Sequence, residues 1–421
     1  MAFVSVGVHV PQNQAISPID EYVYADYMMQ IPERPVVARG DLTGPEARED
    51  LICLGNRGIV APPGPTCEEA ATAPSSEFVM EGKTSADIYT PLYFVTTWAL
   101  AQPLVAAGMG ILDAASYVGA LWLGLALVLL WRVFRALRVP DVVTVGLGAL
   151  LVASPSAFWS STYISTDAPS LAVGAALTLL VLRISRGRNG MLLFAVISVV
   201  GVLFKVQNIA AVALGALALL LWAVGAALTG DGPDGRGRRV ARALVSRPVV
   251  TAVGSVVAAV LAQGGWLAVR SAIAVGESAD QGTAMPLTLK GLATESVKFL
   301  SGSGLDPTGG INGTIIGVAG VLVSWVSVAG VIGLVATSSR GSIEKSLSWA
   351  ALVTSVVIGP VLVLGVSVVT HYYFALPTRY GMSMLPAFLA CAAVLFSRSR
   401  SFGVGLAVAG TLLWIASLTS S

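Results

Sequence analysis

The sequence contains few charged residues and very few histidines and cysteines. Only 11% of its 421 residues are charged, whereas soluble domains carry about 25%. The net charge of +2 provides no basic surface for a nucleic-acid partner, and we expect none. The two histidines and three cysteines form neither a zinc-binding spacing nor a c-type haem motif. Because 55% of the residues are hydrophobic and the mean hydropathy is +0.80, the sequence predicts an all-α polytopic membrane protein.

Long apolar segments fill most of the chain after residue 116. They predict a transmembrane bundle of about ten spans within 117–421. The expected spans are 117–137, 141–160, 168–184, 190–206, 208–228, 248–271, 313–336, 347–370, 380–396 and 402–418. The sequence lacks a visible internal repeat, which argues against a transporter built from duplicated halves.

Basic residues gather at every second turn between these spans, at 132–138, 183–188, 236–247, 340–345 and 398–400. The positive-inside rule makes these turns cytoplasmic, so residues 1–116 and the loop 272–312 are expected outside. The alternation holds only if the apolar residues 90–108, which two prolines interrupt, do not cross the membrane. We therefore predict an interfacial juxtamembrane helix within 90–116.

The region before this helix, residues 1–89, is mostly polar and is expected to be a long external loop. Its first ten residues are apolar but too short to span a bilayer. They have no basic n-region, so we interpret them as the end of a first helix whose beginning is absent, not as a signal peptide. Outside the cytoplasm, a Cys53–Cys67 disulfide is expected, and two free thiols are the alternative.

Two positions in the expected external regions carry candidate catalytic carboxylates. Asp20 and Glu21 are adjacent near the start of the first loop, where they suit a general base or a divalent cation site for Mg²⁺ or Mn²⁺. An exposed acidic pair is the equally weighted alternative. Asp167 precedes the span at 168, with Pro169 just inside it, which is an ordinary N-cap pattern. Capping and a role in the site can coexist.

Basic and aromatic residues also lie on the expected outer face, against the positive-inside rule. Lys205 ends one span, and Arg379 with Tyr380 begins a late one. A lipid phosphate is the natural anion for these cations, although Lys205 could simply snorkel to the interface. His371 lies nearby and is more often structural than catalytic in such a place. The neighbouring tyrosines, among them Tyr373, suit an aromatic belt.

Several short motifs occur in a fixed order on this face. The Asp20-Glu21 pair is followed by TPLYF at residues 90–94 and by STDAP at residues 165–169. These resemble the acidic motif of the first external loop, the "PPLYY" start of the juxtamembrane helix and the "STDxP" element of the GT-C superfamily. That superfamily comprises polytopic glycosyltransferases that take sugars from polyprenyl-phosphate donors, including protein mannosyltransferases and arabinofuranosyltransferases.

Two later motifs extend the resemblance over about residues 15–390. Phe204-Lys205 falls where the family often has a "TK" pair at a helix end. Arg379-Tyr380, followed by MLP at residues 384–386, looks like the "RYxxPxLP" element of a late span. The chain departs from the family in its curtailed first helix and in having no large soluble C-terminal domain.

The resemblance implies a fold and a reaction. The fold is a GT-C-like bundle, and the reaction is inverting transfer of a sugar to a glycan, lipid or protein of the cell envelope. Asp20 would be the general base or a metal-holding carboxylate, with Glu21 in support, and Asp167 would orient a sugar. Lys205, Arg379, Tyr380 and His371 would bind the lipid phosphate.

The composition, rich in alanine, valine and glycine, is reminiscent of high-GC actinobacteria. With the resemblance, it implies a bacterial cytoplasmic membrane with the active site facing outside. Two alternatives remain, a carrier or flippase for a lipid-linked sugar and a catalytically inactive GT-C-like scaffold. The central spans are almost wholly apolar, which favours chemistry at one face over transport through the bilayer.

Overall fold

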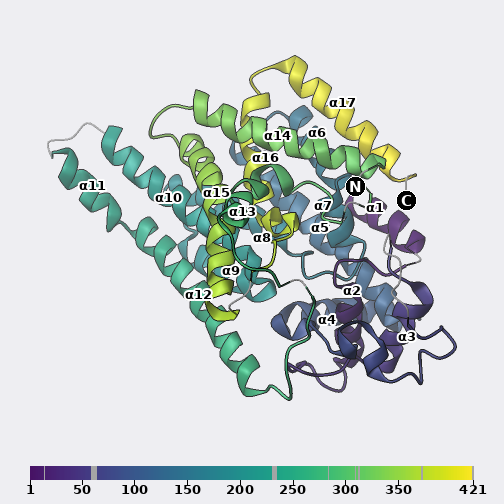
Figure 1. The fold of residues 1–421 in the computed structure, drawn as a ribbon. Helices are drawn as coiled ribbons and strands as arrows, with labels where there is room; N and C mark the ends of the chain where they lie inside the picture. The colour runs from purple at the N-terminus through teal and green to yellow at the C-terminus, as the bar shows by residue number, and fades with distance from the viewer. Residues whose placement is uncertain are drawn as a thin grey trace.

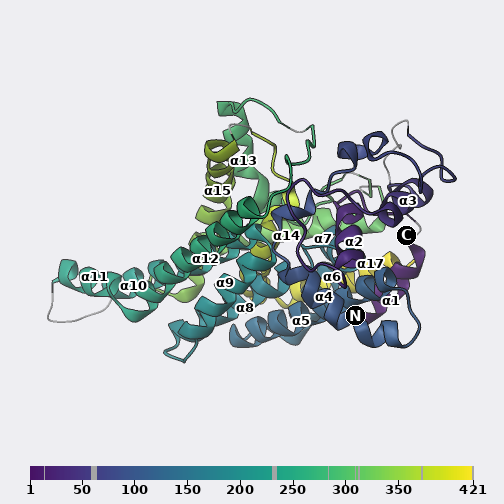
Figure 2. The same ribbon diagram turned by 90° about the horizontal axis from the view of Figure 1, so that it is seen from below.

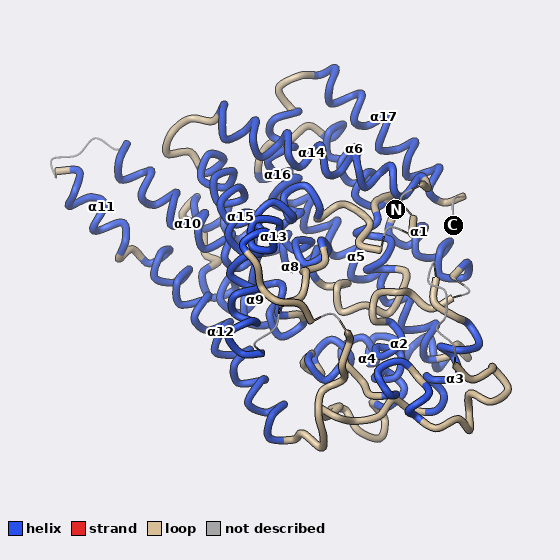
Figure 3. The backbone as a smooth tube through the Cα atoms, in the orientation of Figure 1, coloured by secondary structure: helices blue, strands red, loops and turns tan. Residues whose placement is uncertain are grey.

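The computed structural model is helical throughout the part of the chain that it describes. It describes residues 1–13, 15–57, 64–229, 235–282, 284–308, 310–311, 313–370 and 373–419. These residues contain helices and connecting loops with a few isolated backbone bridges and no strand, as Figure 3 shows. The predicted all-α class is therefore confirmed for the described residues.

The apolar part of the chain forms a bundle of packed helices (Figure 1). Its elements are α5 (Ile111–Ala136), α6 (Asp141–Val152), α7 (Pro155–Ser161), α8 (Ser170–Ser185), α9 (Met191–Phe204), η5 (Val206–Asn208), α10 (Ile209–Thr229), α11 (Arg236–Leu244), α12 (Arg247–Ala272), α13 (Leu289–Gly302), α14 (Ile315–Thr337), α15 (Ile343–Thr370), η6 (Thr378–Met384), α16 (Leu385–Phe396) and α17 (Arg400–Ser417). In the described residues, seven helical segments are long and apolar enough to cross a membrane, or eight if the bent pair α6–α7 is one span. The protein is therefore an integral membrane protein.

Each of the ten expected spans falls on a helix, but three of them differ from a simple crossing. The span expected at 141–160 is broken into α6 and α7, which meet at 57°. Pro155 begins α7, and proline has no N–H for the hydrogen bond that would continue α6. The spans expected at 168–184 and 190–206 are α8 and α9, which have only 16 and 14 residues.

The polar N-terminal region folds at one end of the bundle, at the lower right in Figure 1. It contains α1 (Ala2–His9), η1 (Val10–Gln12), α2 (Glu21–Gln30), α3 (Pro45–Leu54), η2 (Ser75–Glu77), η3 (Val79–Gly82) and η4 (Ala86–Ile88), followed by α4 (Leu92–Ala106). A disulfide joins Cys53 to Cys67, as expected. The expected juxtamembrane helix corresponds to α4, which packs against α5. The apolar first residues form α1, which packs on α5 and α17.

The stretch 272–312, which was expected to be an external loop, contains the helix α13, whose 14 residues make almost four turns. Thr288 caps α13 by accepting a hydrogen bond from the Gly291 N–H at 3.0 Å. Phe299 is fully buried, and Leu292 packs against the main hydrophobic core. Figure 2 shows α13 beside α15 on the same side of the molecule as α2 and α3.

Helix α8 lies inside the bundle and fixes the position of η6, which carries Arg379. Gly174 on α8 faces the carbonyl oxygen of Ser383, so closely that a Cβ atom at position 174 would overlap it. Gly302 on α13 approaches the side chain of Thr378 in the same way. These two glycines let the backbone of η6 fit between α8 and α13, which an ordinary side chain would prevent.

Gly174→Ala should therefore destabilise the protein by about 1–3 kcal/mol, the usual cost of overpacking a tight contact. The matched control is Gly254→Ala on α12, where a Cβ would meet nothing within 4 Å. That substitution should be neutral or slightly stabilising, because alanine is the better helix former. Thermal unfolding of both variants in detergent tests the prediction, and equal melting temperatures would contradict it.

Candidate active site

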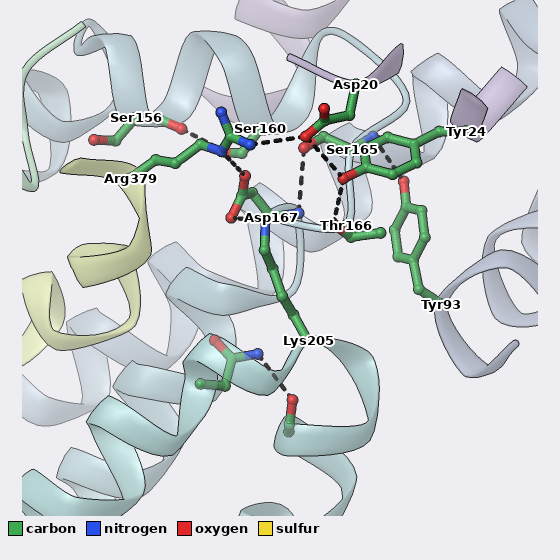
Figure 4. Close-up of polar contacts among 12 residues, drawn as sticks. Asp20, Tyr24, Tyr93, Ser156, Ser160, Ser165, Thr166, Asp167, Lys205 and Arg379 are labelled. Carbon is green, nitrogen blue, oxygen red and sulfur yellow. Dashed lines mark hydrogen bonds and ion pairs between the residues drawn. The ribbon is translucent and has the colours of Figure 1, made fainter. Parts of the chain in front are cut away.

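Four charged side chains from four separate segments meet at the N-terminal end of α8, as Figure 4 shows. Lys205 Nζ lies 2.6 Å from Asp167 Oδ1. Arg379 Nη2 lies 2.8 Å from Asp20 Oδ2, and Arg379 Nε lies 3.3 Å from Asp167 Oδ2. We call these four residues the ion-pair cluster. Two carboxylates and two cations make the cluster electrically neutral.

The cluster has an enclosed half and an accessible half. The side chains of Lys205 and Asp167 are 0% and 5% exposed. Those of Arg379 and Asp20 are 13% and 35% exposed. An approaching substrate would therefore meet Asp20 and Arg379 first, while the Asp167–Lys205 pair lies behind them.

Asp20 reaches Arg379 because of an unusual backbone conformation. Its φ of 59° and ψ of 8° lie in the left-handed region, at the residue that precedes α2. This region costs a residue other than glycine roughly 1–2 kcal/mol, and aspartate and asparagine tolerate it best among those. Such strain tends to be retained at functional sites, where the surrounding structure holds it in place.

The expected N-cap role of Asp167 is wrong. Pro169 is the residue that precedes α8, and no side chain caps this helix end. The Asp167 side chain is instead directed to Lys205 and Arg379, because two buried cations require an anion at this point. The hydrogen bond from the Ser170 N–H to the Asp167 carbonyl oxygen closes the turn without using the side chain.

The alternative that Lys205 snorkels to the interface is also wrong, since its side chain is fully buried. Lys205 follows α9 in an extended conformation that separates this helix from η5. Its Nζ lies 5.8 Å from the ring centre of Tyr89 and 5.5 Å from that of Tyr380. Aromatic faces are favourable neighbours for a desolvated ammonium group.

Polar side chains of the N-terminal region support the accessible half of the cluster. The Tyr24 hydroxyl donates to Asp20 Oδ2 at 3.4 Å and accepts from Thr166 Oγ1 at 3.2 Å. Burial raises the pKa of Tyr24 well above its ordinary value, and Tyr89 and Asp20 add to this effect. Tyr24 therefore remains a neutral hydroxyl that can donate to Asp20. The Tyr93 hydroxyl accepts a hydrogen bond from the Ser165 N–H at 3.0 Å and so fixes the loop that carries Asp167.

Glu21 does not join Asp20 in this cluster. Its Oε2 accepts from the Ser17 N–H at 2.7 Å, and its Oε1 accepts from the Ile164 N–H at 2.8 Å. Glu21 thus ties α2 to the loop before α8. Burial raises the pKa of Glu21 from 4.5 to about 7, against the opposing effect of the two backbone N–H groups.

This shift predicts how stability depends on pH. A carboxyl group with a raised pKa binds its proton more tightly in the folded state, so its contribution to stability is present below pH 4.5 and is lost as pH rises through 7. Relative to Glu21→Gln, which cannot ionise, the free energy of unfolding of the wild type should fall by on the order of 3 kcal/mol as the pH rises from 4.5 to above 7. Chemical unfolding at pH 4.5 and pH 7.5 measures the difference. A control is Glu77→Gln at an exposed position, and a pH-independent difference for Glu21→Gln would refute the prediction.

The Asp20–Glu21 pair does not fit a divalent cation. Both Glu21 oxygens already accept backbone hydrogen bonds, and Asp20 Oδ2 is occupied by Arg379. In the described part of the chain, no three histidine, cysteine, aspartate or glutamate side chains gather into a metal site built from protein ligands alone. We therefore assign no step of the chemistry to Mg²⁺ or Mn²⁺.

Two cavities meet at Asp20. The Arg379 cavity has a volume of about 430 Å³ and is lined by Asp20, Ser85, Ile88, Tyr89, Gln281, Gly282, Met285, Phe374, Ala375, Pro377, Arg379 and Tyr380. The Ser17 cavity has a volume of about 730 Å³ and is lined by Ser17, Pro18, Asp20, Glu21, Tyr22, Val23, Leu51, Asn56, Val79, Met80, Ser85, Asp280, Gln281 and Gly282. Four residues, Asp20 among them, line both cavities and form their shared wall.

The segment that carries Arg379 is anchored to α13 at Leu376. The Leu376 N–H donates to Glu295 Oε1 at 3.2 Å, and the Leu376 carbonyl oxygen accepts from Lys298 Nζ at 2.7 Å. The Tyr373 hydroxyl donates to the same Glu295 oxygen at 3.1 Å. Tyr373 is buried by these contacts, so the aromatic-belt interpretation is wrong for it. Glu295 and Lys298 thus hold the backbone three residues before Arg379.

The structure brings together most, but not all, of the residues singled out in the sequence. Asp20, Asp167, Lys205 and Arg379 form the cluster, and Tyr380 packs against both cations. His371 lies outside the described residues.

Three supporting residues were missed, although Tyr24 lies one helical turn after Asp20 and Tyr89 directly precedes the motif at 90–94. The third, Glu295, was hidden because its helix was expected to be a loop.

The chain matches no model of a known protein family and no curated protein sequence. Its function must therefore be inferred from the geometry of the ion-pair cluster and the two cavities.

Proposed function

We propose that the chain is an inverting membrane glycosyltransferase that transfers a sugar from a polyprenyl-phosphate donor to a hydroxyl group outside the cytoplasm. The observation that supports this most is the position of Asp20, which lies on the shared wall of two cavities and contacts Arg379. Glycosyl transfer needs a base beside the acceptor hydroxyl and a cation beside the leaving phosphate. In this proposal Asp20 supplies the base and Arg379 supplies the cation, and the two side chains are in contact.

In this proposal the donor lies in the Arg379 cavity. Arg379 and the Tyr380 hydroxyl bind the phosphate, and the apolar lining formed by Met285 and Phe374 suits the first units of a lipid tail. The acceptor lies in the larger Ser17 cavity, where Tyr22, Asn56 and Asp280 offer polar groups to a sugar or peptide.

The reaction follows from this arrangement. Asp20 takes the proton of the acceptor hydroxyl, and the acceptor oxygen forms a bond to the anomeric carbon. The bond between that carbon and the phosphate oxygen breaks on the opposite face, which inverts the configuration. The polyprenyl phosphate leaves with the electron pair, and Arg379 stabilises its developing negative charge.

The contact between Asp20 and Arg379 supports an order of binding in the proposed reaction. Asp20 and the donor phosphate compete for the same guanidinium group, since Arg379 Nη2 is only 2.8 Å from Asp20. In the proposal, the phosphate replaces the Asp20 carboxylate on Arg379 and leaves Asp20 free to accept a proton. Donor binding would then precede acceptor activation.

Lys205 and Asp167 receive positioning roles, which differ from the contacts first expected of them. Neither residue lines the Arg379 cavity. Lys205 holds Asp167, and Asp167 holds Arg379 Nε, so the inner pair fixes the orientation of the guanidinium group. Lys205 therefore supports phosphate binding without touching the phosphate.

The test is release of polyprenyl phosphate by the purified protein. The wild type would be incubated with a panel of polyprenyl-phosphate sugars and cell-envelope acceptors, with Asp20→Asn in parallel. Release that requires both an acceptor and Asp20 would support the proposal and identify the donor. Movement of a labelled donor across liposomes without release would instead indicate a carrier. Absence of both activities with every donor would favour an inactive scaffold.

A further inference from the structure

A third cavity lies at the other end of α8, away from the ion-pair cluster. It has a volume of about 720 Å³ and forms where α5 and α8 end. Because α8 has 16 residues and rises 1.5 Å per residue, the cavity lies about 24 Å from the Asp167 end of the helix. We call it the arginine cavity. It has no part in the proposed transfer reaction.

Six arginines line the arginine cavity, namely Arg132, Arg135, Arg138, Arg183, Arg186 and Arg188. Arg132 and Arg135 lie in the C-terminal part of α5, and Arg138 follows this helix. Arg183 lies in the last turn of α8, and Arg186 and Arg188 follow it, about 50 residues later in the chain. Among the described residues that line it, Glu344 is the one carboxylate. Arg138 has a φ of 58°, so its position in the turn is one that would suit glycine better.

The local charges do not cancel. Arg135 faces Asp141 at 3.8 Å, and Arg186 donates to the Ala136 carbonyl oxygen at 2.5 Å. In the part of the chain that the structure describes, no carboxylate lies within 4.0 Å of the guanidinium groups of the other four arginines. The carboxylates of Asp141 and Glu344 together contribute a charge of about −2, and the C-terminal ends of α5 and α8 contribute about half a negative charge each. The six arginines therefore leave a net charge of about +3.

The positive-inside rule explains why arginines occur at this end of the bundle, but it does not require them to converge. Arg236 and Arg238 on α11 satisfy the same rule, but neither lines the arginine cavity, the Arg379 cavity or the Ser17 cavity. Convergence of unpaired cations on a concave surface concentrates the electrostatic potential and attracts anions. Guanidinium groups in particular match the geometry of phosphate oxygens.

We propose that the arginine cavity binds a phosphate group at the end of the bundle opposite the ion-pair cluster. The phosphate would belong either to the headgroup of an anionic phospholipid or to a soluble phosphate compound. Its donors are Arg183 and Arg188, at and just after the C-terminal end of α8, and Arg132 and Arg138, at and just after the C-terminal end of α5.

Calorimetric titration of the full chain in neutral detergent tests this assignment. The probes are phosphatidylglycerol, phosphatidylcholine and sodium pyrophosphate. We expect Arg183→Gln/Arg188→Gln to weaken phosphate-probe binding at least tenfold, whereas Arg236→Gln/Arg238→Gln, which removes the same charge from α11, should bind as the wild type does. Because these side chains are exposed, both double variants should keep the wild-type melting temperature.

The outcomes separate the two sources of phosphate. Binding of phosphatidylglycerol but not pyrophosphate assigns the cavity to a lipid headgroup, and binding of pyrophosphate assigns it to soluble phosphate. Equal loss in the two double variants would overturn the proposal, because bulk charge would then explain the binding. No difference between phosphatidylglycerol and phosphatidylcholine, together with no pyrophosphate binding, would also overturn it.

Discussion

Asp20→Asn should lower the rate of sugar transfer by about 10²–10⁴-fold, the usual contribution of a positioned general base. The substitution removes the basic carboxylate but keeps an oxygen that can accept from Arg379. Asparagine also tolerates the left-handed backbone at this position, with its φ of 59°. The variant should therefore fold as the wild type does, and its melting temperature should change little while turnover falls.

A control variant and a single-turnover measurement make this result interpretable. Asp41→Asn, in the same N-terminal region but paired with Arg34 away from both cavities, should leave turnover unchanged. If Asp20→Asn retained more than about a tenth of the wild-type rate, general-base catalysis by Asp20 would be refuted on these magnitudes. Single-turnover measurement at saturating donor separates a loss in chemistry from a loss in binding.

Asp167→Asn should be the most destabilising substitution in the cluster, with a loss of about 3–5 kcal/mol in unfolding free energy. Asp167 is the carboxylate within 4.0 Å of Lys205, whose side chain is fully buried. Without Asp167, the ammonium group remains desolvated and unpaired, and Arg379 loses one of its two carboxylates. Unfolding of the detergent-solubilised protein measures the effect.

A second substitution shows whether the lost stability comes from the unpaired charge of Lys205 or from a general packing defect. Asp167→Asn combined with Lys205→Met removes both buried charges and should recover at least half of the lost stability. Glu81→Gln, which breaks the exposed pair with Lys83, should cost less than about 1 kcal/mol. A double variant as unstable as Asp167→Asn would show that the stranded charge is not the cause.

The sequence predicted the bundle well where helices face lipid and less well where they face protein. Lipid requires about 20 consecutive apolar residues for a crossing, and segments such as α10 and α14 meet that condition. Helices α8 and α9 are shorter because protein surrounds much of α8 and polar connections end them early. Helix α13 was missed because its glycines, serines and lysines conceal the apolar side that buries Phe299.

Helix α2 was missed for a different physical reason. Tyr22, Tyr24 and Tyr27 are all buried, on different sides of the helix. A helix enclosed by protein on all sides has no polar face, so its sequence shows no amphipathic periodicity.

The site was easier to find than its internal pairing. Charged residues at the ends of apolar segments stand out, because lipid would not accept them without a partner. Which charge meets which depends on backbone turns that leave little trace in the sequence. Asp20 and Glu21 are neighbours, yet the left-handed turn at Asp20 sends one carboxylate to Arg379 and the other to the Ile164 N–H.

The shared wall between the two cavities has a consequence for inhibitor design. Their volumes, about 430 and 730 Å³, fall within the range of pockets that accept drug-sized molecules. A compound with one arm in each cavity would pass Asp20 at its midpoint. Linking two weak fragments in this way can raise affinity by about 10²–10⁴-fold over either fragment alone, provided that the linker spans the wall without strain.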